Sequence, residues 1–372
     1  MINEKITLNQ AIFSIILFCF GSSVIIGISS TAKQDTWISI VLATLLAIPV
    51  FLMYARMIKL FPEKNFFEIA ETVLGKVAGK IVSAFMIWYA IHLAALVLRD
   101  FGEFIQVFDM PETPKLPITI LLTLTTVYLA RSTMRSIGKW SVVAICFVLS
   151  IVLLTFATSI HQMHFDNLLP IMEATPVQII KSSCEIVAFP YGESVVFLCV
   201  ADSFHKENSP YRTFLFSLAI VVFVFLAVFV RNLALLCTSM VNISYFPSYI
   251  AVRIIEIGDF FARIESSISS NFILAGIVKI AVCLLAAGKG IANLLGLQNN
   301  QIFVLPAGML ALALGSISYR SIMEMFLFLD YYMYYAFPFQ ILIPMIVWIA
   351  AEISTKKQKK RELASPPVGD SP

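Results

Sequence analysis

The sequence predicts an all-α membrane protein that crosses the bilayer ten times, and three observations lead to this expectation. Of the 372 residues, 59% are hydrophobic and only 13% are charged, whereas soluble proteins carry about a quarter charged residues. The mean hydropathy is +0.88. Apolar runs of about 20 residues, the length that spans a bilayer as a helix, recur along the chain. The whole length therefore fits one polytopic bundle, and the net charge of +3 gives no reason to expect a nucleic-acid partner.

The expected spans follow one another between polar connections. Examples are FPEKNFFEIAETVLGK after the second span and HKENSPY after the sixth. The fourth and ninth spans are short, and the tyrosine-rich run 331–335 beside the last span is typical of an interfacial aromatic belt. The ten spans cover residues 9–31, 37–59, 80–106, 115–131, 139–159, 183–202, 213–237, 267–288, 301–319 and 333–354.

The distribution of Lys and Arg predicts that both termini are cytoplasmic. Residues 356–372, KKQKKRELASPPVGDSP, form a basic cytoplasmic tail that either only fixes the topology or also binds anionic lipid. Residues 246–266 are expected to form an amphipathic helix on the outer surface of the bilayer. That helix carries an apolar stripe at helical spacing, formed by Ile250, Ile254, Ile257, Phe261 and Ile264.

No pattern in the chain favours an enzyme, a metal site or a cofactor. The six cysteines all lie in apolar runs without a C-x-x-C pair, so neither a disulfide framework nor a zinc site is expected. His161 and His164 lack carboxylate or cysteine partners at ligand spacing. We therefore expect no metal, no cofactor and no catalytic residue.

Ten spans divide into two sets of five, residues 1–160 and 161–355, with the outer segment 160–182 as the seam. Because five is odd, the second set crosses the membrane in the opposite sense to the first. If the two halves share a fold, they form an inverted repeat, an architecture found in many secondary transporters.

The first span of each half contains residues that break helices. The first span reads FGSSVIIG, with Gly21, Ser22, Ser23 and Gly27, and the sixth reads FPYGE, with Phe189, Pro190, Tyr191, Gly192 and Glu193. Glycine and proline there favour an unwound backbone, which is tolerated at membrane depth only where it faces protein or a wet cavity. Each motif alone also fits close packing or a simple kink. Together they predict a substrate-binding site whose half-helix ends and hydroxyls suit a zwitterionic amino acid.

Two charged residues lie deep in the expected spans, where an ionisable group suggests a function. Glu193 can hold a ligand ammonium group or anchor the broken segment. Lys279, in ILAGIVKIAVCLLAAG of span eight, can replace a coupling cation or titrate with protons, or it can form a structural pair with a carboxylate. Tyr89 in span three lines the pocket or belongs to a packed aromatic face. Arg99, Asp100 and Glu103 lie nearer the outer end of span three and suggest a vestibule network.

Several stretches together resemble the B subunits of nutrient germinant receptors from endospore-forming bacteria, the spore permeases of the amino acid–polyamine–organocation superfamily. They are ITLNQAIFSIILF, LFPEKNFFEIAETVLGKVAGK, MPETPKLPITI, DNLLPIM, AFPYGESVVFL and FPSYIAVRIIEIGDFFARIES. The most specific are the Phe-Pro-Lys-like turn and the Gly-Lys-x-x-Gly after span two, and the Pro-x-Gly-Glu of span six. Two departures are RSTMRSIGK after span four and SSISSNF, which lacks the Trp expected at the start of span eight.

The resemblance implies a LeuT-type fold of ten helices with broken helices one and six. It also implies a nutrient ligand, an A subunit and a lipoprotein C subunit as partners, and residence in the spore inner membrane. We expect a membrane subunit that binds a small nutrient, an amino acid, and signals germination. The alternative is an amino-acid permease that works by proton or cation symport.

Overall fold

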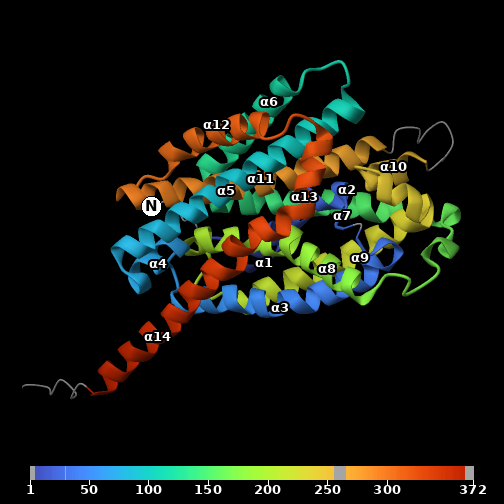
Figure 1. Ribbon diagram of the computed structural model, residues 1–372. Helices are drawn as coiled ribbons and strands as arrows, with labels where there is room; N and C mark the ends of the chain where they lie inside the picture. The colour runs from blue at the N-terminus through green and yellow to red at the C-terminus, as the bar shows by residue number, and fades with distance from the viewer. Residues whose placement is uncertain (1–4, 30, 255–264, 365–372) are drawn as a thin grey trace, which may run out of the picture.

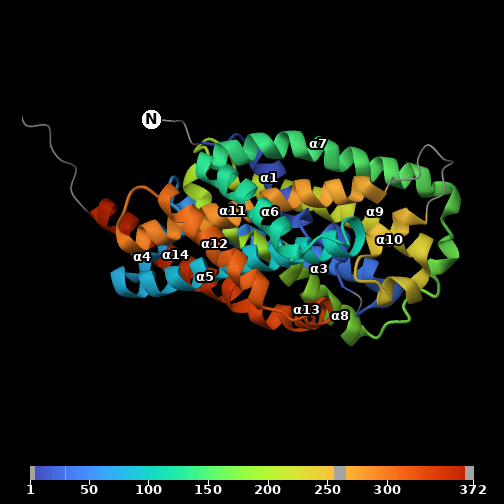
Figure 2. The same ribbon diagram turned by 90° about the horizontal axis from the view of Figure 1, so that it is seen from above.

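The computed structural model describes residues 5–29, 31–254 and 265–364. Within these ranges the regular elements are all helices, apart from an isolated bridge between Ile6 and Phe204. The helices form one elongated bundle (Figures 1 and 2). The all-α prediction is thereby confirmed.

The first half of the bundle contains seven α-helices joined by short connections. They are α1 (Leu8–Phe20), α2 (Ser23–Ile26), α3 (Thr36–Leu60), α4 (Phe66–Leu74), α5 (Lys76–Phe104), α6 (Lys115–Ser132) and α7 (Met134–Ser159). Thr7 caps α1 and Asn65 caps α4, each in a reciprocal capping box. The π-helical turn η2 (Ile105–Asp109) extends α5.

The second half contains more irregular helices. They are α8 (Pro176–Ile186), η5 (Val187–Tyr191), η6 (Gly192–Ser203), α9 (Pro210–Ile243), α10 (Pro247–Arg253), α11 (Glu265–Leu295), α12 (Gln301–Ile317), α13 (Ile322–Phe337), η8 (Pro338–Leu342) and α14 (Ile343–Ala364). η5 and η8 are π-helical turns, and η6 is a 3-10 helix.

Seven helical segments of the described chain are long and apolar enough to cross a membrane. They are Lys33–Leu60, Lys76–Asp109, Met134–Gln162, Pro176–Ser203, Pro210–Ile243, Ile268–Leu295 and Ile322–Gln358. The first and ninth expected spans fall on the shorter apolar helices α1 and α12, and the fourth falls on α6. The count of ten spans and its division at residue 160 therefore stay predictions.

Two of these segments form the centre of the bundle. In the most apolar 18-residue stretch of Ile268–Leu295, 89% of the residues are buried. The corresponding stretch of Pro176–Ser203 is 83% buried, whereas that of Ile322–Gln358 is only 28% buried. The broken sixth span and the helix that carries Lys279 are thus surrounded by protein on most sides. A charged residue on either helix must find its partner inside the protein.

The structure changes the boundaries of three expected elements. The last span begins at Ile322 rather than at residue 333, with Ser321 as its N-cap. The first part of the expected tail, residues 356–364, is helical, because α14 continues to Ala364. The end of α14 projects from the bundle (Figure 1). Of the expected amphipathic helix, residues 255–264 lie outside the described part. α10 buries Tyr249 and Val252, whereas Ile254 is exposed.

Candidate functional site

The first helix break lies between α1 and α2, where the motif Gly-Ser-Ser predicts it. Gly21 has φ −11° and ψ −88°, which ends α1, and α2 is only one turn long. Gly27 ends that turn with φ +87°, a conformation that favours glycine. A Cβ atom at Gly21 would collide with the side chain of Lys279. The break therefore brings the backbone of the first span directly against span eight.

The second break lies at Phe189 and Pro190. Phe189 has extended angles, φ −134° and ψ 109°, inside the helical run. Pro190 lacks an N–H and cannot continue the turn. The next half-helix, η6, starts at Gly192, so Glu193 is its second residue. A carboxylate at this end of a helix is favourably placed relative to the helix dipole.

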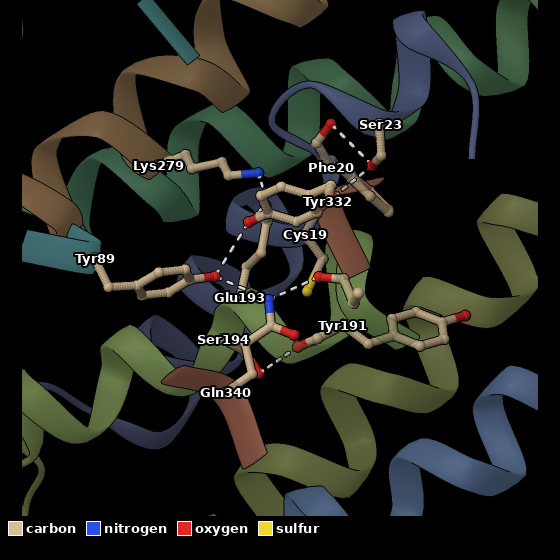
Figure 3. Close-up of polar contacts among 11 residues, drawn as sticks. Cys19, Phe20, Ser23, Tyr89, Tyr191, Glu193, Ser194, Lys279, Tyr332 and Gln340 are labelled. Carbon is tan, nitrogen blue, oxygen red and sulfur yellow. Dashed lines mark hydrogen bonds and ion pairs between the residues drawn. The ribbon is translucent and has the colours of Figure 1, made fainter. Parts of the chain in front are cut away.

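A buried ion pair connects this second break to α11. The Nζ atom of Lys279 lies 2.5 Å from Oε2 of Glu193, and the two side chains are 0% and 1% exposed. The hydroxyl of Tyr332, on α13, donates to Oε1 of Glu193 at 2.7 Å (Figure 3). The ammonium group also lies over the rings of Phe18 and Phe189, 5.5 and 5.2 Å from their centroids. The ammonium group of Lys279 is thus in direct contact with a carboxylate.

Hydrogen bonds extend from this pair to η8. The hydroxyl groups of Tyr89 and Tyr332 are 3.1 Å apart, and Nε2 of Gln340 donates to the oxygen of Tyr89 at 2.8 Å (Figure 3). Nε2 of Gln340 also donates to the carbonyl of Ala188 at 2.8 Å, and Tyr54 donates to the carbonyl of Gln340 at 2.6 Å. Gln340 thus satisfies a backbone group next to the break, as unwound helices in membranes require.

A small hollow adjoins the pair, and a much larger cavity lies beyond it. A hollow of about 20 Å³ is lined by Ser22, Asp100, Glu193 and Lys279, which is room for a single water molecule. A cavity of about 360 Å³ lies beside it and is lined by Ser23, Gly27, Glu185, Phe225, Asn232 and Asp330, among others. Phe189, Leu329 and Tyr332 line both spaces. These three side chains therefore separate the ion pair from the larger cavity.

The structure brings together most of the site residues that the sequence predicts, and it places Tyr191 apart from them. Tyr191 points away from the pair, because its hydroxyl lies 3.2 Å from Oγ1 of Thr44 and its ring stacks on Phe225. Asp100 lines the small hollow, whereas Arg99 and Glu103 form an ion pair with each other. The hydroxyl of Ser23 donates to the carbonyl of Cys19 at 2.6 Å, so it already has a partner.

Sequence reasoning missed three residues of the network: Tyr54, Tyr332 and Gln340. Tyr332 belongs to the run expected to form an interfacial belt, yet it is 2% exposed, whereas Tyr331 is 67% exposed. Gln340, 1% exposed, is a polar residue inside an apolar run, and this signal could have identified it. Among the described residues, no group of three His, Cys, Asp or Glu side chains is placed to hold a metal ion.

Comparisons with known proteins point to one family and one fold. The family described as "Spore germination protein" matches residues 5–324. Spore germination protein KB of Bacillus subtilis (strain 168) is 23% identical, and the alignment covers 97% of this chain and 98% of that protein. Spore germination protein YndE of the same organism is 22% identical, covering 78% of this chain and 81% of the relative.

Two solved structures share the overall fold. The crystal structure of MhsT in complex with L-phenylalanine has a TM-score of 0.70 at 11% identity, covering 93% of this chain and 89% of that one. The substrate-bound, outward-open Na+-coupled sialic acid symporter has a TM-score of 0.65 at 12% identity, covering 89% and 76%. The expected LeuT-type fold with broken first and sixth helices is confirmed.

Proposed function

The chain belongs to the spore germination protein family, and from this premise we propose that it is the membrane subunit of a germinant receptor that binds an amino acid at its broken helices and thereby signals germination. The observation that carries the proposal is the fully buried pair of Glu193 and Lys279, which lies between the two helix breaks. The pair offers one carboxylate and one ammonium group.

A zwitterionic amino acid also carries one ammonium group and one carboxylate, and each can face the residue of opposite charge in the pair. Its ammonium group can pair with Glu193 while its carboxylate pairs with Lys279. Opening the pair without a replacement would leave two buried charges unpaired, and a buried pair that loses one partner costs about 3–5 kcal/mol. A zwitterion restores both contacts, so it binds the opened state more tightly than the closed one. Such a difference in affinity is what allows a ligand to shift a conformational equilibrium.

The sizes of the small hollow and the larger cavity support a route in which the ligand reaches the ion pair only after side chains between them move. The hollow at the pair, about 20 Å³, is too small for an amino acid, whereas the adjoining cavity of about 360 Å³ falls in the range of about 300–1,000 Å³ typical of small-molecule sites. The ligand enters the larger cavity, and movement of Phe189 and Tyr332 gives it access to the pair. Its side chain then stays among Phe189, Phe225 and the other residues of the cavity.

Lys279 takes the place of a coupling cation in this proposal. Its ammonium group compensates the carboxylate of Glu193 in the absence of ligand, so the protein needs no bound ion for neutrality. Substrate-contacting roles for Gly21, Ser22, Ser23, Gly27, Pro190 and Gly192 belong to the same proposal. Tyr89 contributes through its contact with Tyr332.

The proposed receptor includes partners. They are the A subunit and the lipoprotein C subunit that the resemblance implies, and we propose that they detect the shift of the bundle. The receptor would reside in the spore inner membrane, with both termini of this chain in the cytoplasm. The alternative function is an amino-acid permease driven by proton or cation symport. It is favoured by the fold shared with a Na+-coupled symporter.

Germination of spores that carry variants of this chain tests the receptor proposal. Glu193→Gln should raise the concentration of the effective amino acid needed for half-maximal germination at least about tenfold, the equivalent of about 1.4 kcal/mol from one charge-assisted contact. Glu352→Gln, the same replacement in the Arg56–Glu352 pair, is the control and should respond like the wild type. An unchanged response of Glu193→Gln at normal membrane abundance would remove this residue from the site.

Uptake into proteoliposomes separates the receptor from the permease. The purified chain alone is reconstituted and offered each standard amino acid in labelled form, with and without a proton or sodium gradient. Binding without accumulation supports the receptor. Accumulation that depends on the gradient supports the permease.

A further inference from the structure

A second hollow lies where α5 ends, α6 begins and α12 ends. Its volume is about 280 Å³, and it shares no lining residue with the two spaces at the candidate site. α12 packs against both α5 and α6. The hollow is lined by Leu98, Arg99, Lys115, Leu116, Leu312 and Ser316, among others.

The hollow carries an excess of positive charge. Nη2 of Arg99 and Nζ of Lys115 both bind Oε1 of Glu103, at 2.7 and 2.6 Å. The side chain of Glu103 is only 4% exposed, and it does not line the hollow. Two cations therefore share one carboxylate oxygen. Among the described residues that line the hollow, none is acidic.

One hydrogen-bond donor of the Arg99 guanidinium group also lacks a partner among the described residues. Its side chain is 10% exposed, and Nη1 donates to the carbonyl of Gly315 at 3.5 Å. Its Nε atom is buried and has no hydrogen-bond partner in the described part of the chain. A buried donor without a partner is unfavourable. An anion in the hollow would balance the extra positive charge of Arg99 and Lys115.

The surroundings of the hollow suit the chains of a lipid. On α6, Leu116, Leu121 and Leu124 are exposed by 52%, 68% and 54%, and on α12, Met309 is exposed by 62%. In a chain that spans the membrane, these side chains face the acyl region. Gly102 allows the close approach of α6, because a Cβ atom there would lie 3.0 Å from Cγ2 of Thr119. The two cations of the hollow and the apolar flanks thus adjoin where α5 and α12 end and α6 begins.

We propose that this hollow binds the phosphate group of an anionic phospholipid, with the acyl chains lying along the exposed leucines of α6 and the apolar face of α12. Arg99 and Lys115 provide charge-assisted hydrogen bonds to phosphate oxygens. Basic pockets between transmembrane helices bind anionic headgroups on the same principle. The site goes beyond the proposed nutrient site and does not depend on it.

Native mass spectrometry of the purified full-length chain in neutral detergent tests the proposal, with phosphatidylglycerol and phosphatidylcholine of the same acyl chains as probes. Lys115→Gln removes one cation and leaves the Arg99–Glu103 pair in place. Ser316→Leu fills the hollow without changing charge. Lys76→Gln, at the exposed start of α5, is the matched control for loss of one positive charge.

The wild type should bind phosphatidylglycerol more tightly than phosphatidylcholine. Lys115→Gln should weaken phosphatidylglycerol binding about fivefold, the equivalent of about 1 kcal/mol for one basic residue. Ser316→Leu should also weaken binding, and Lys76→Gln should leave it unchanged. Equal affinity for the two lipids, or wild-type binding by both Lys115→Gln and Ser316→Leu, would overturn the proposal. Displacement of the lipid by an equal concentration of glycerol phosphate would also overturn it, because the hollow would then recognise a free phosphate.

Discussion

The buried pair of Glu193 and Lys279 predicts a strong energetic coupling between two positions 86 residues apart in the sequence. Lys279→Met leaves the carboxylate of Glu193 buried without its cation, and Glu193→Gln leaves the ammonium group without its anion. Each single change should lower the free energy of unfolding by about 3–5 kcal/mol. Independent effects would therefore add to about 6–10 kcal/mol in the double variant.

The double variant Glu193→Gln/Lys279→Met should lose far less of the free energy of unfolding than this sum, because no buried charge remains unpaired. Tyr332 can still donate to the amide oxygen that replaces Oε1 of Glu193, at the position where it now donates at 2.7 Å. The main cost is then the amide donors left without a partner, about 1–3 kcal/mol. The double variant should thus be more stable than either single one.

Titration of the purified proteins with SDS in mixed micelles, followed by far-ultraviolet circular dichroism, measures this cycle. Lys76→Met, at the exposed start of α5, controls for the loss of a lysine and should stay within about 0.5 kcal/mol of the wild type. A single variant that fails to accumulate in the membrane, while the double variant does accumulate, would also show that the double variant is the more stable of the two. A double variant that loses the sum of the two single effects would refute the coupling.

Three further predictions concern the same site and the topology. Tyr332→Phe removes the hydrogen bond to Glu193 and should lower the free energy of unfolding by about 1.5–3 kcal/mol in the same titration; an unchanged value would contradict the contact. Gly21→Ala places a Cβ atom against the paired lysine and should reduce the germination response at normal membrane abundance, whereas a wild-type response would show that this close approach is dispensable. In a cysteine-depleted background, Val177→Cys should react with an impermeant thiol reagent from outside and Gln358→Cys only after permeabilisation, and the reverse would overturn the orientation.

The fold was predictable to the extent that hydrophobicity defines it. Long apolar runs located the long apolar helices, and glycine and proline located both helix breaks. The start of the last span was missed because Glu324 and Asp330 interrupt its apolar pattern, although both side chains are exposed and leave the helix intact. The pattern of a single helix does not reveal which of its sides faces protein.

The candidate site was predictable residue by residue but not as a set of contacts. A charge in an apolar run needs a partner, which identified Glu193 and Lys279 separately. That they pair with each other depends on the packing of η6 against α11, which sequence spacing does not encode. The direction of Tyr191 depends on the π-helical turn η5, and a regular helix pattern does not predict such a turn.

Equilibrium binding of labelled amino acids to purified wild type and to Glu193→Gln/Lys279→Met tests the central claim most directly. The double variant keeps the bundle without the two charges, so any loss of affinity belongs to the site and not to the fold. We predict that the amino acid bound by the wild type binds the double variant at least about a hundredfold more weakly, for the loss of two charge-assisted contacts of about 1.4 kcal/mol each. Equal affinity in the two proteins would contradict the claim that the ion pair is the amino-acid site.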